Sequence, residues 1–442
     1  CRCKNKKILE IFYKNILLYY SKKNINNDKI FFVIPFLWLY PDFRHHKHGL
    51  FFFRKKKYGN SKKYYFCNVI KVQNVMLVKF AVKNFRGFVE RIEWDLSHPN
   101  NYEFNKNAVR DGVIKNGIVY GPNGSGKSNF ALAIFDIENH LSSKCKKNDY
   151  YSNFVYAGNP KAPVGFEYVF KFGDDLLEYQ YSKNSAGLLI AESLLVNHKL
   201  VFKKDAAIFE IDDEQFKIDS TVKENFKQNV NSVSVINFIM ASYPLPQDHY
   251  IVKLMLFVNS MLWFKNLDSR EFIGLETSSF GLEEFIIQNN YVEDFSQFLA
   301  KVSEQEFMFV APKEGDKILF CEIGGNTTPF LSIASTGTKA LELLYVWIKR
   351  MSAASFVFID EFDAFYHFKL SFEVCKLLFN MDCQIFTSSH NTYLMTNDLL
   401  RPDCNFILQN NKIKPLQACT EKELRFGHNI EKIYRANAFH VE

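Results

Sequence analysis

Residues 121–128 read Gly121-Pro122-Asn123-Gly124-Ser125-Gly126-Lys127-Ser128. This run fits G-x-x-x-x-G-K-[ST], the pattern of a phosphate-binding P-loop. Its glycines allow backbone conformations that a Cβ would forbid, so that consecutive N–H groups can point at phosphate oxygens. Lys127 adds a positive charge for the β- and γ-phosphates, and the Ser128 hydroxyl can ligate Mg²⁺. The run therefore predicts that the chain binds a nucleoside triphosphate such as ATP.

The sequence on both sides of the loop supports this prediction. Residues 113–120 contain two apolar runs that are typical of a buried strand leading into the loop. Residues 128–140 carry apolar side chains at helical spacing, and the N-terminus of such a helix favours an anion. A Gly/Ser-rich turn that matches by chance is the alternative, but it would need neither the strand nor the helix. We expect nucleotide contacts from all eight loop residues and from Asn129.

A second apolar run, residues 355–361, reads Ser355-Phe356-Val357-Phe358-Ile359-Asp360-Glu361 and ends in two acidic residues. Downstream of a P-loop this is the Walker B arrangement. In that interpretation Asp360 holds Mg²⁺ and Glu361, as the catalytic base, polarises the attacking water. The alternative is a pair of solvated acids at the end of a strand.

Residues 384–388 predict another buried strand, which is followed by Ser389-His390-Asn391. A histidine at the carboxyl end of a strand in an α/β sheet lies on the edge where ligands bind. Its imidazole can donate to a γ-phosphate, so we predict that His390 acts beside Glu361 and Lys127 in catalysis. A lone histidine is more often structural, and only its position after the other two motifs favours a function.

Residues 335–339, Ser335-Thr336-Gly337-Thr338-Lys339, precede an amphipathic helix. Hydroxyl and N–H groups at a helix N-terminus can bind an anion. Taken alone, however, this run is more simply interpreted as an ordinary Ser/Thr N-cap.

Taken together and in this order, the motifs resemble those of ABC-type ATPases. Within that class the chain is similar to the AAA-family, OLD-like ATPases of bacteria, which are relatives of the RecF and SMC proteins. The similarity spans about 77–95, 113–140 and 317–435, and it rests on Asn84-Phe85-Arg86, residues 121–128, residues 335–339, residues 356–363 with His367, and Ser389-His390-Asn391.

The resemblance implies a homodimer with two ATP molecules held between the subunits. Lys127 and Ser128 of one copy would face Ser335, Thr336 and Gly337 of the other, and Asp363 would lie in a loop that crosses the interface. The Q-loop of ABC-type ATPases is not evident in the sequence, and Gln180 is its best candidate.

By the same resemblance, the chain is expected to be a cytoplasmic ATPase in phage defence or DNA maintenance, with an effector protein as a further partner. Two alternatives stay open. One is the energising subunit of a membrane transporter, which co-purification with a membrane protein would favour. The other is a nucleotide-gated binding module with negligible turnover, in which replacing Glu361 would leave activity unchanged.

The charge distribution gives little support for nucleic-acid binding. The net charge of the 442 residues is +7. Residues 1–75 contain 17 Lys and Arg against 3 Asp and Glu, whereas residues 76–442 contain 38 against 45. DNA binding therefore needs a local basic patch. Lys144, Lys146 and Lys147 are candidates for it, although a solvated lysine loop is the simpler interpretation.

The sequence predicts four segments. Residues 1–75 lack methionine and are rich in Lys, Asn, Phe, Tyr and Ile, so we expect a non-native or disordered leader. A basic arm for a membrane or a nucleic acid is the alternative, but its apolar run at 30–40 is too short to span a bilayer. Residues 76–210 are predicted to form an N-terminal ATPase lobe with the P-loop and an antiparallel β layer. Residues 211–305 are predicted to form a helical insertion that includes a helix at 250–264. Residues 306–442 are predicted to form a C-terminal lobe with the remaining motifs. The expected fold is an α/β P-loop NTPase of the ABC-ATPase-head type with a mixed sheet.

The nine cysteines show no CxxC pair and no zinc-ligand spacing. Most lie among apolar neighbours, which favours buried free thiols in a cytosolic protein.

Overall fold

The structure is a computed structural model. It describes residues 52–58, 61–67, 75–142, 153–228, 233–266, 271–274, 281–313, 315–351, 353–364 and 366–441. The chain divides into two units, Cys1–Ile70 and Lys71–Glu442. In the first unit, β1 (Phe52–Tyr58) and β2 (Ser61–Cys67) pair as an antiparallel hairpin. The rest of the predicted leader, apart from Val75, lies outside the described residues, and so does the lysine cluster at 144–147.

The motif-bearing strands belong to a seven-stranded mixed sheet in the second unit. Its order is β14-β13-β17-β18-β7-β19-β20. The five inner strands are parallel, and β14 and β20 pair antiparallel at the two edges. The strands are β7 (Asn116–Tyr120), β13 (Leu262–Asn266), β14 (Glu271–Gly274), β17 (Phe356–Ile359), β18 (Gln384–Ser389), β19 (Asn405–Gln409) and β20 (Lys412–Pro415). β7, β17 and β18 are buried at every residue, as expected for parallel strands covered on both faces.

The second large sheet is antiparallel, with the order β12-β11-β10-β9-β8-β3-β4. Its strands are β3 (Val75–Lys83), β4 (Ile92–Asp95), β8 (Val164–Phe172), β9 (Asp175–Lys183), β10 (Leu189–Val196), β11 (Lys199–Lys204) and β12 (Phe209–Ile211). Along β8 fully buried residues alternate with partly buried ones, because successive side chains point to opposite faces. The predicted α/β class, with a mixed sheet and an antiparallel β layer, is confirmed. Two-stranded sheets are formed by β5 (Val109–Arg110) with β6 (Val113–Ile114), and by β15 (Phe320–Ile323) with β16 (Asn326–Pro329).

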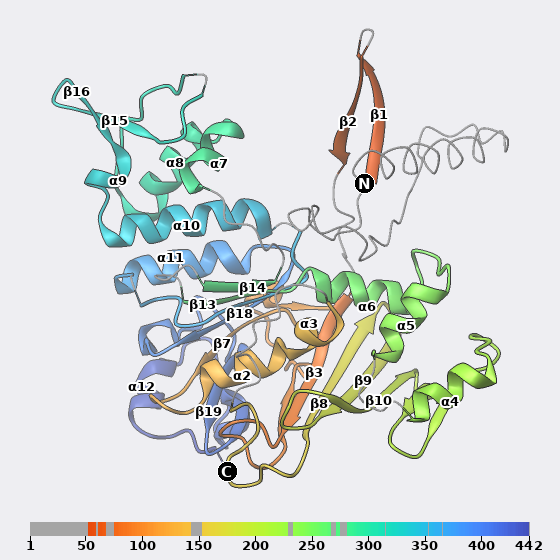
Figure 1. Cartoon of the computed structure of the whole chain (residues 1–442). Coiled ribbons are helices and arrows are strands. Elements are labelled where there is room, and N and C mark those ends of the chain that lie inside the picture. Colours follow the sequence, from red (N-terminus) through yellow and green to blue (C-terminus); the bar gives the residue numbers. More distant parts are fainter. Residues whose placement is uncertain are drawn as a thin grey trace. The chain divides into compact units, whose positions relative to one another are not determined.

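Helices cover the sheets and fill the space between them (Figure 1). They are α2 (Lys127–Ile134), α3 (Asp136–Leu141), α4 (Ser220–Gln228), α5 (Val235–Ser242), α6 (Tyr250–Asn259), α7 (Leu282–Gln288), α8 (Val292–Ser303), α9 (Phe330–Ile333), α10 (Thr336–Met351), α11 (Phe368–Phe379) and α12 (Ile430–Arg435).

The helix that follows the P-loop packs against both large sheets. On α2, the Phe130 ring lies 5.7 Å from Phe80 of β3 and 5.5 Å from Trp94 of β4. Phe135, which links α2 to α3, lies 5.9 Å from Trp263 of β13. Aromatic pairs at such distances add about 0.5–1.5 kcal/mol each beyond their buried area. The position of the P-loop helix is therefore set by the hydrophobic core.

The structure differs from the sequence prediction around residue 260. The helix predicted to run to residue 264 ends at Asn259, and Leu262–Asn266 is instead β13, which pairs parallel with β17. The region predicted as a helical insertion, 211–305, thus also supplies two strands of the mixed sheet. Periodicity alone did not reveal the change, because only the polar pair Asn259-Ser260, with no Gly or Pro, separates the apolar residues of the helix from those of the strand.

Among the helices of the described residues, none combines the length and the apolar character needed to cross a bilayer.

Candidate nucleotide site

The glycines of the P-loop hold conformations that other residues would strain. Gly124 and Gly126 have φ values of 76° and 99°, in the left-handed region. A Cβ on Gly121 would lie 2.5 Å from the Leu408 carbonyl oxygen. The loop therefore lies directly against β19 and turns into α2, whose first residue is Lys127.

Lys127 closes over the loop. Its side chain is buried, and Nζ donates to the carbonyl oxygens of Gly121 at 2.9 Å and of Pro122 at 3.3 Å. Burial lowers the pKa of Lys127, and the charges of Asp360, Glu361 and Asp363 oppose this shift. The carboxylates are thus close enough to act on the ammonium group, although 233 or more residues separate them from it in sequence.

Asp360 directly follows β17 and lies close to Lys127. Asp360 is 3% exposed, and its carboxylate accepts hydrogen bonds from the hydroxyls of Ser128 and Ser388. Burial raises the pKa of Asp360; these two hydrogen bonds and the Lys127 charge oppose the shift. A hydroxyl and a carboxylate oxygen in contact are the hard ligands that Mg²⁺ prefers, so the residues present fit this ion.

Glu361 follows with a strained backbone. Its φ is 45°, a left-handed conformation that costs a non-glycine residue about 1–2 kcal/mol. The backbone N–H of Glu361 donates to Ser388 Oγ at 2.8 Å, which helps to hold this conformation. The Glu361 side chain is 58% exposed, and its Oε1 lies 3.7 Å from Nε2 of His390. Strain of this kind is characteristic of functional positions.

The β18 strand supplies the third group of side chains. Ser389 Oγ donates to Oδ2 of Asp363 at 2.7 Å and accepts from the backbone N–H of Asn391 at 2.8 Å. Burial raises the pKa of Asp363. The charge of His390 opposes this shift, and the charge of Glu361 adds to it. The predicted catalytic and metal residues therefore share one edge of the mixed sheet, at the carboxyl ends of β7, β17 and β18.

The loop itself is open to solvent on its outer side. Pro122, Asn123, Gly124 and Ser128 are exposed, so the loop backbone can be reached by a ligand. The buried Ser125 hydroxyl has no hydrogen-bond partner among the described residues. An exposed glycine-rich backbone at a helix N-terminus, with an unused hydroxyl, fits a bound polyphosphate.

Two contributors were missed as site residues by sequence reasoning. Ser388 links Asp360 to the backbone of Glu361. Arg86 donates from Nη1 to Oδ1 of Asn129 at 3.3 Å, which brings a cation to the first turn of α2. The sequence signal for Ser388 was a serine inside an otherwise apolar strand. The signal for Arg86 was its place in the Asn84-Phe85-Arg86 turn.

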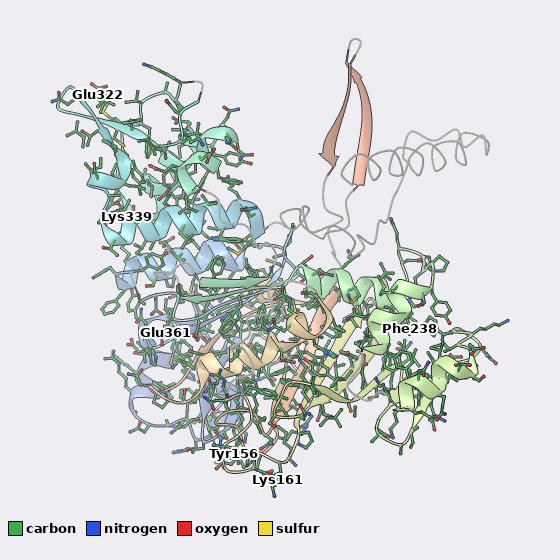
Figure 2. The ribbon with its side chains drawn as sticks, viewed as in Figure 1. Tyr156, Lys161, Phe238, Glu322, Lys339 and Glu361 are labelled. Atoms are coloured by element: carbon green, nitrogen blue, oxygen red, sulfur yellow. The ribbon has the colours of Figure 1, made fainter. Side chains whose placement is uncertain are left out.

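The Ser335 run is not part of this cluster. Ser335 and Thr336 are exposed, and Ser335 Oγ accepts from the backbone N–H of Thr338 at 3.1 Å, as an N-cap of α10. Figure 2 shows Lys339 at the start of α10 and Glu361 beyond α11. Gln180, the candidate for the Q-loop, lies within β9, paired with Glu167 and Ser193 in the antiparallel sheet, and therefore not in a loop.

Asp360→Asn should stabilise the protein measured without nucleotide or metal. A raised pKa means that the folded state binds the proton more tightly, so stability falls as pH rises from the unfolded value near 3.8 through the native pKa, and the loss persists at neutral pH. The amide of asparagine does not ionise, so the variant does not undergo this loss of stability. We expect a higher unfolding free energy for the variant than for the wild type at pH 7, measured by urea denaturation.

The gain should vanish at a pH below both pKa values, and Mg²⁺ with ATP should stabilise the wild type but not the variant. Asp398→Asn, at an exposed position, is the matched control and should leave stability within about 0.5 kcal/mol. If Asp360→Asn were less stable than the wild type at pH 7, burying the Asp360 charge would not destabilise the folded protein, and the explanation would be wrong.

Comparison with known families identifies part of the chain. Residues 265–396 match the family described as "AAA domain, putative AbiEii toxin, Type IV TA system". The predicted resemblance to AAA-family ATPases is confirmed. The matched AAA segment contains the Ser335 run, Asp360 and Glu361, and the His390 strand, but not the P-loop.

Solved structures with partial similarity to the chain include SMC head domains. The SMC head domain from Thermotoga maritima has 17% identity and a TM-score of 0.39, covering 77% of this chain and 98% of that one. An SmcHead bound to the C-winged helix domain of ScpA has 16% identity and a TM-score of 0.39, covering 76% and 96%. An Smc head with an extended coiled coil, bound to the C-terminal domain of ScpA derived from Pyrococcus furiosus, has 15% identity and a TM-score of 0.37, covering 77% and 95%. No curated protein matches the chain at a significant level.

Proposed function

We propose that the chain is a cytoplasmic ATPase that binds Mg²⁺·ATP at residues 121–128 and hydrolyses it. The observation that carries the proposal is the convergence of Lys127, Ser128, Asp360, Glu361 and His390 at one edge of the mixed sheet. A chance P-loop match would not bring two acidic residues and a histidine from the ends of two other strands to the lysine at the start of α2.

Each residue has a role that its position allows. The loop N–H groups and Lys127 bind the phosphates, and Ser128 with Asp360 holds Mg²⁺. The exposed Glu361 carboxylate polarises the attacking water. His390, next to Glu361, donates to the γ-phosphate, and Asp363 positions it through Ser389 and Asn391.

We further propose that two copies close around ATP. Ser335, Thr336 and Gly337 lie at the N-terminus of a 16-residue helix and reach the solvent, which suits an anion brought by another subunit. Hydrolysis would separate the copies again. We also propose a role in phage defence or DNA maintenance, with an effector protein as partner. The toxin–antitoxin wording of the matched family supports the defence role alone.

The test is a measurement of ATP turnover and of solution mass by light scattering, on the full chain with and without Mg²⁺·ATP. The proposal expects turnover, and a mass that rises from about 51.7 kDa towards twice that value when ATP is bound. Tight ATP binding with no turnover would favour a nucleotide-gated module instead.

A stacked aromatic pair beside the site should anchor the second copy. Phe368 and Tyr393 have their ring centroids 6.0 Å apart and are 56% and 49% exposed, and Tyr393 lies three residues after His390. Large aromatic side chains dominate interface energies, at about 2 kcal/mol or more for a hot spot. Replacing both by serine should weaken ATP-dependent dimerisation about 10–100-fold, as measured by sedimentation.

The matched control is Phe426→Ser, because Phe426 is 55% exposed and also contacts an aromatic ring, that of Phe104. It should leave dimerisation intact. Unchanged dimerisation in the Phe368, Tyr393 double variant would remove this pair from the interface.

A further inference from the structure

A small lobe stands between the two halves of the ATPase machinery in sequence. It comprises residues 281–334, with α7, α8, α9 and the β15–β16 hairpin (Figure 1). Within the lobe the Phe330 ring contacts the rings of Phe295, Phe307 and Phe309, and this aromatic group is continuous with the main hydrophobic core. Helices α7 and α8 pack on α10, the helix that begins with the Ser335 run.

The outer side of this lobe is hollowed. A groove of about 940 Å³ lies between the end of α7, the start of α8 and residues 307–313 and 315–317. Its apolar lining includes Ile287, Val292, Met308 and Phe309. Met308 is 70% exposed, the largest exposed fraction among the exposed large hydrophobic residues that the structure describes. A groove that exposes apolar side chains among polar ones is a typical site for a peptide segment.

The charge of the lobe indicates what kind of segment fits. Its described residues include eight acidic and three basic side chains. Glu284, Glu293 and Asp316 line the groove together with Lys313 and Lys317, and Lys317 pairs with Glu284 at 3.8 Å, so the lining keeps a small acidic excess. Lys349 and Lys369, from the neighbouring helices, neutralise two other lobe acids, so an acidic excess remains. Figure 2 shows a further acid, Glu322, on the β15–β16 hairpin.

We propose that this groove binds a segment of a partner protein in which apolar side chains are flanked by lysine or arginine. The apolar side chains would cover Met308 and Phe309, and the cations would face the acidic rim. The lobe that carries the groove is also connected to the Ser335 run: just after α8, Gln305 Oε1, outside the groove lining, accepts from the Thr338 hydroxyl at 2.8 Å, and this hydroxyl contacts Ser335 Oγ. A bound partner would therefore act on the helix whose end holds the Ser335 N-cap.

The probes are two fluorescent 16-residue synthetic peptides with the same leucine positions, one with lysine and one with glutamate at every other site. Binding to the full chain is measured by anisotropy, without nucleotide, so that the result does not depend on ATP hydrolysis. We expect the lysine peptide to bind and the glutamate peptide to bind at least tenfold more weakly. Met308→Lys should weaken binding of the lysine peptide at least tenfold, and because Met308 is so exposed this change should not affect folding.

The matched control is Leu200→Lys, which adds the same charge at an exposed leucine of β11 in the antiparallel sheet. It should leave the affinity unchanged. Equal binding of both peptides, equal weakening by both variants, or no effect of Met308→Lys would each overturn the proposal. A rise in mass with the lysine peptide absent, lost in Met308→Lys, would assign the groove to a second copy of the chain and overturn it as well.

Discussion

Glu361→Gln should lower the rate of ATP turnover by about 10²–10⁴-fold, the usual contribution of a general base. The amide keeps the size of the side chain but cannot accept the proton of the attacking water. The backbone N–H bond to Ser388 does not involve the side chain, so the local conformation should be preserved. ATP affinity should therefore stay near that of the wild type, and the ATP-bound dimer should accumulate because the step that separates it is slow.

The measurements are single-turnover hydrolysis and light scattering with ATP present. Glu322→Gln, an exposed glutamate on the β15–β16 hairpin, is the matched control and should behave as the wild type. Unchanged turnover in Glu361→Gln would show that this carboxylate is not the base, and would favour a nucleotide-gated module if wild-type turnover is itself negligible.

Lys127→Ala should abolish ATP binding at concentrations that saturate the wild type. Hydrogen bonds from an ammonium to phosphate oxygens contribute about 1.5–3 kcal/mol each, so losing two of them lowers affinity about 10²–10⁴-fold. The variant loses the Nζ bonds to the Gly121 and Pro122 carbonyls, but the loop should survive because the glycine conformations and the packing on β19 also hold its shape. Isothermal titration with ATP and Mg²⁺ measures the loss directly.

Lys161→Ala removes an equally charged but exposed lysine and serves as the control (Figure 2). Its ATP affinity should be unchanged. Should Lys127→Ala bind ATP as tightly as the wild type, the loop would not be the phosphate site.

Much of the sheet architecture follows from local patterns. Buried parallel strands read as continuous apolar runs, and the antiparallel strands alternate, so residues 113–120 and 164–196 predict their own structure. Asp360 and His390 could be assigned to the site because parallel strands end at one edge. The side chains that organise the site could not be assigned in this way. Ser388 matters only because β18 lies beside β17, and pairing between distant strands leaves no local trace.

The limits of sequence reasoning are clearest where a tertiary contact overrides periodicity. Residues 262–264 fit the predicted helix, yet residues 262–266 form β13 because the edge of β17 offers backbone partners. From the sequence alone, Gln384 is only a polar residue at the start of a predicted strand. In the structure its side chain is fully buried and bonds to the backbone of Leu77, which joins the two sheets.

The shared ATP site is tested most directly by mixing two variants that should each be inactive. Lys127→Ala lacks the phosphate lysine, and Ser335→Arg places a bulky charge where the second copy would meet the nucleotide. Each variant alone inactivates both sites of its own dimer. A mixed dimer contains one site with an intact Lys127 from one copy and an intact Ser335 from the other. The account predicts that an equal mixture regains about a quarter of the wild-type turnover, whereas wild-type turnover by Ser335→Arg alone, or no gain on mixing, would contradict it.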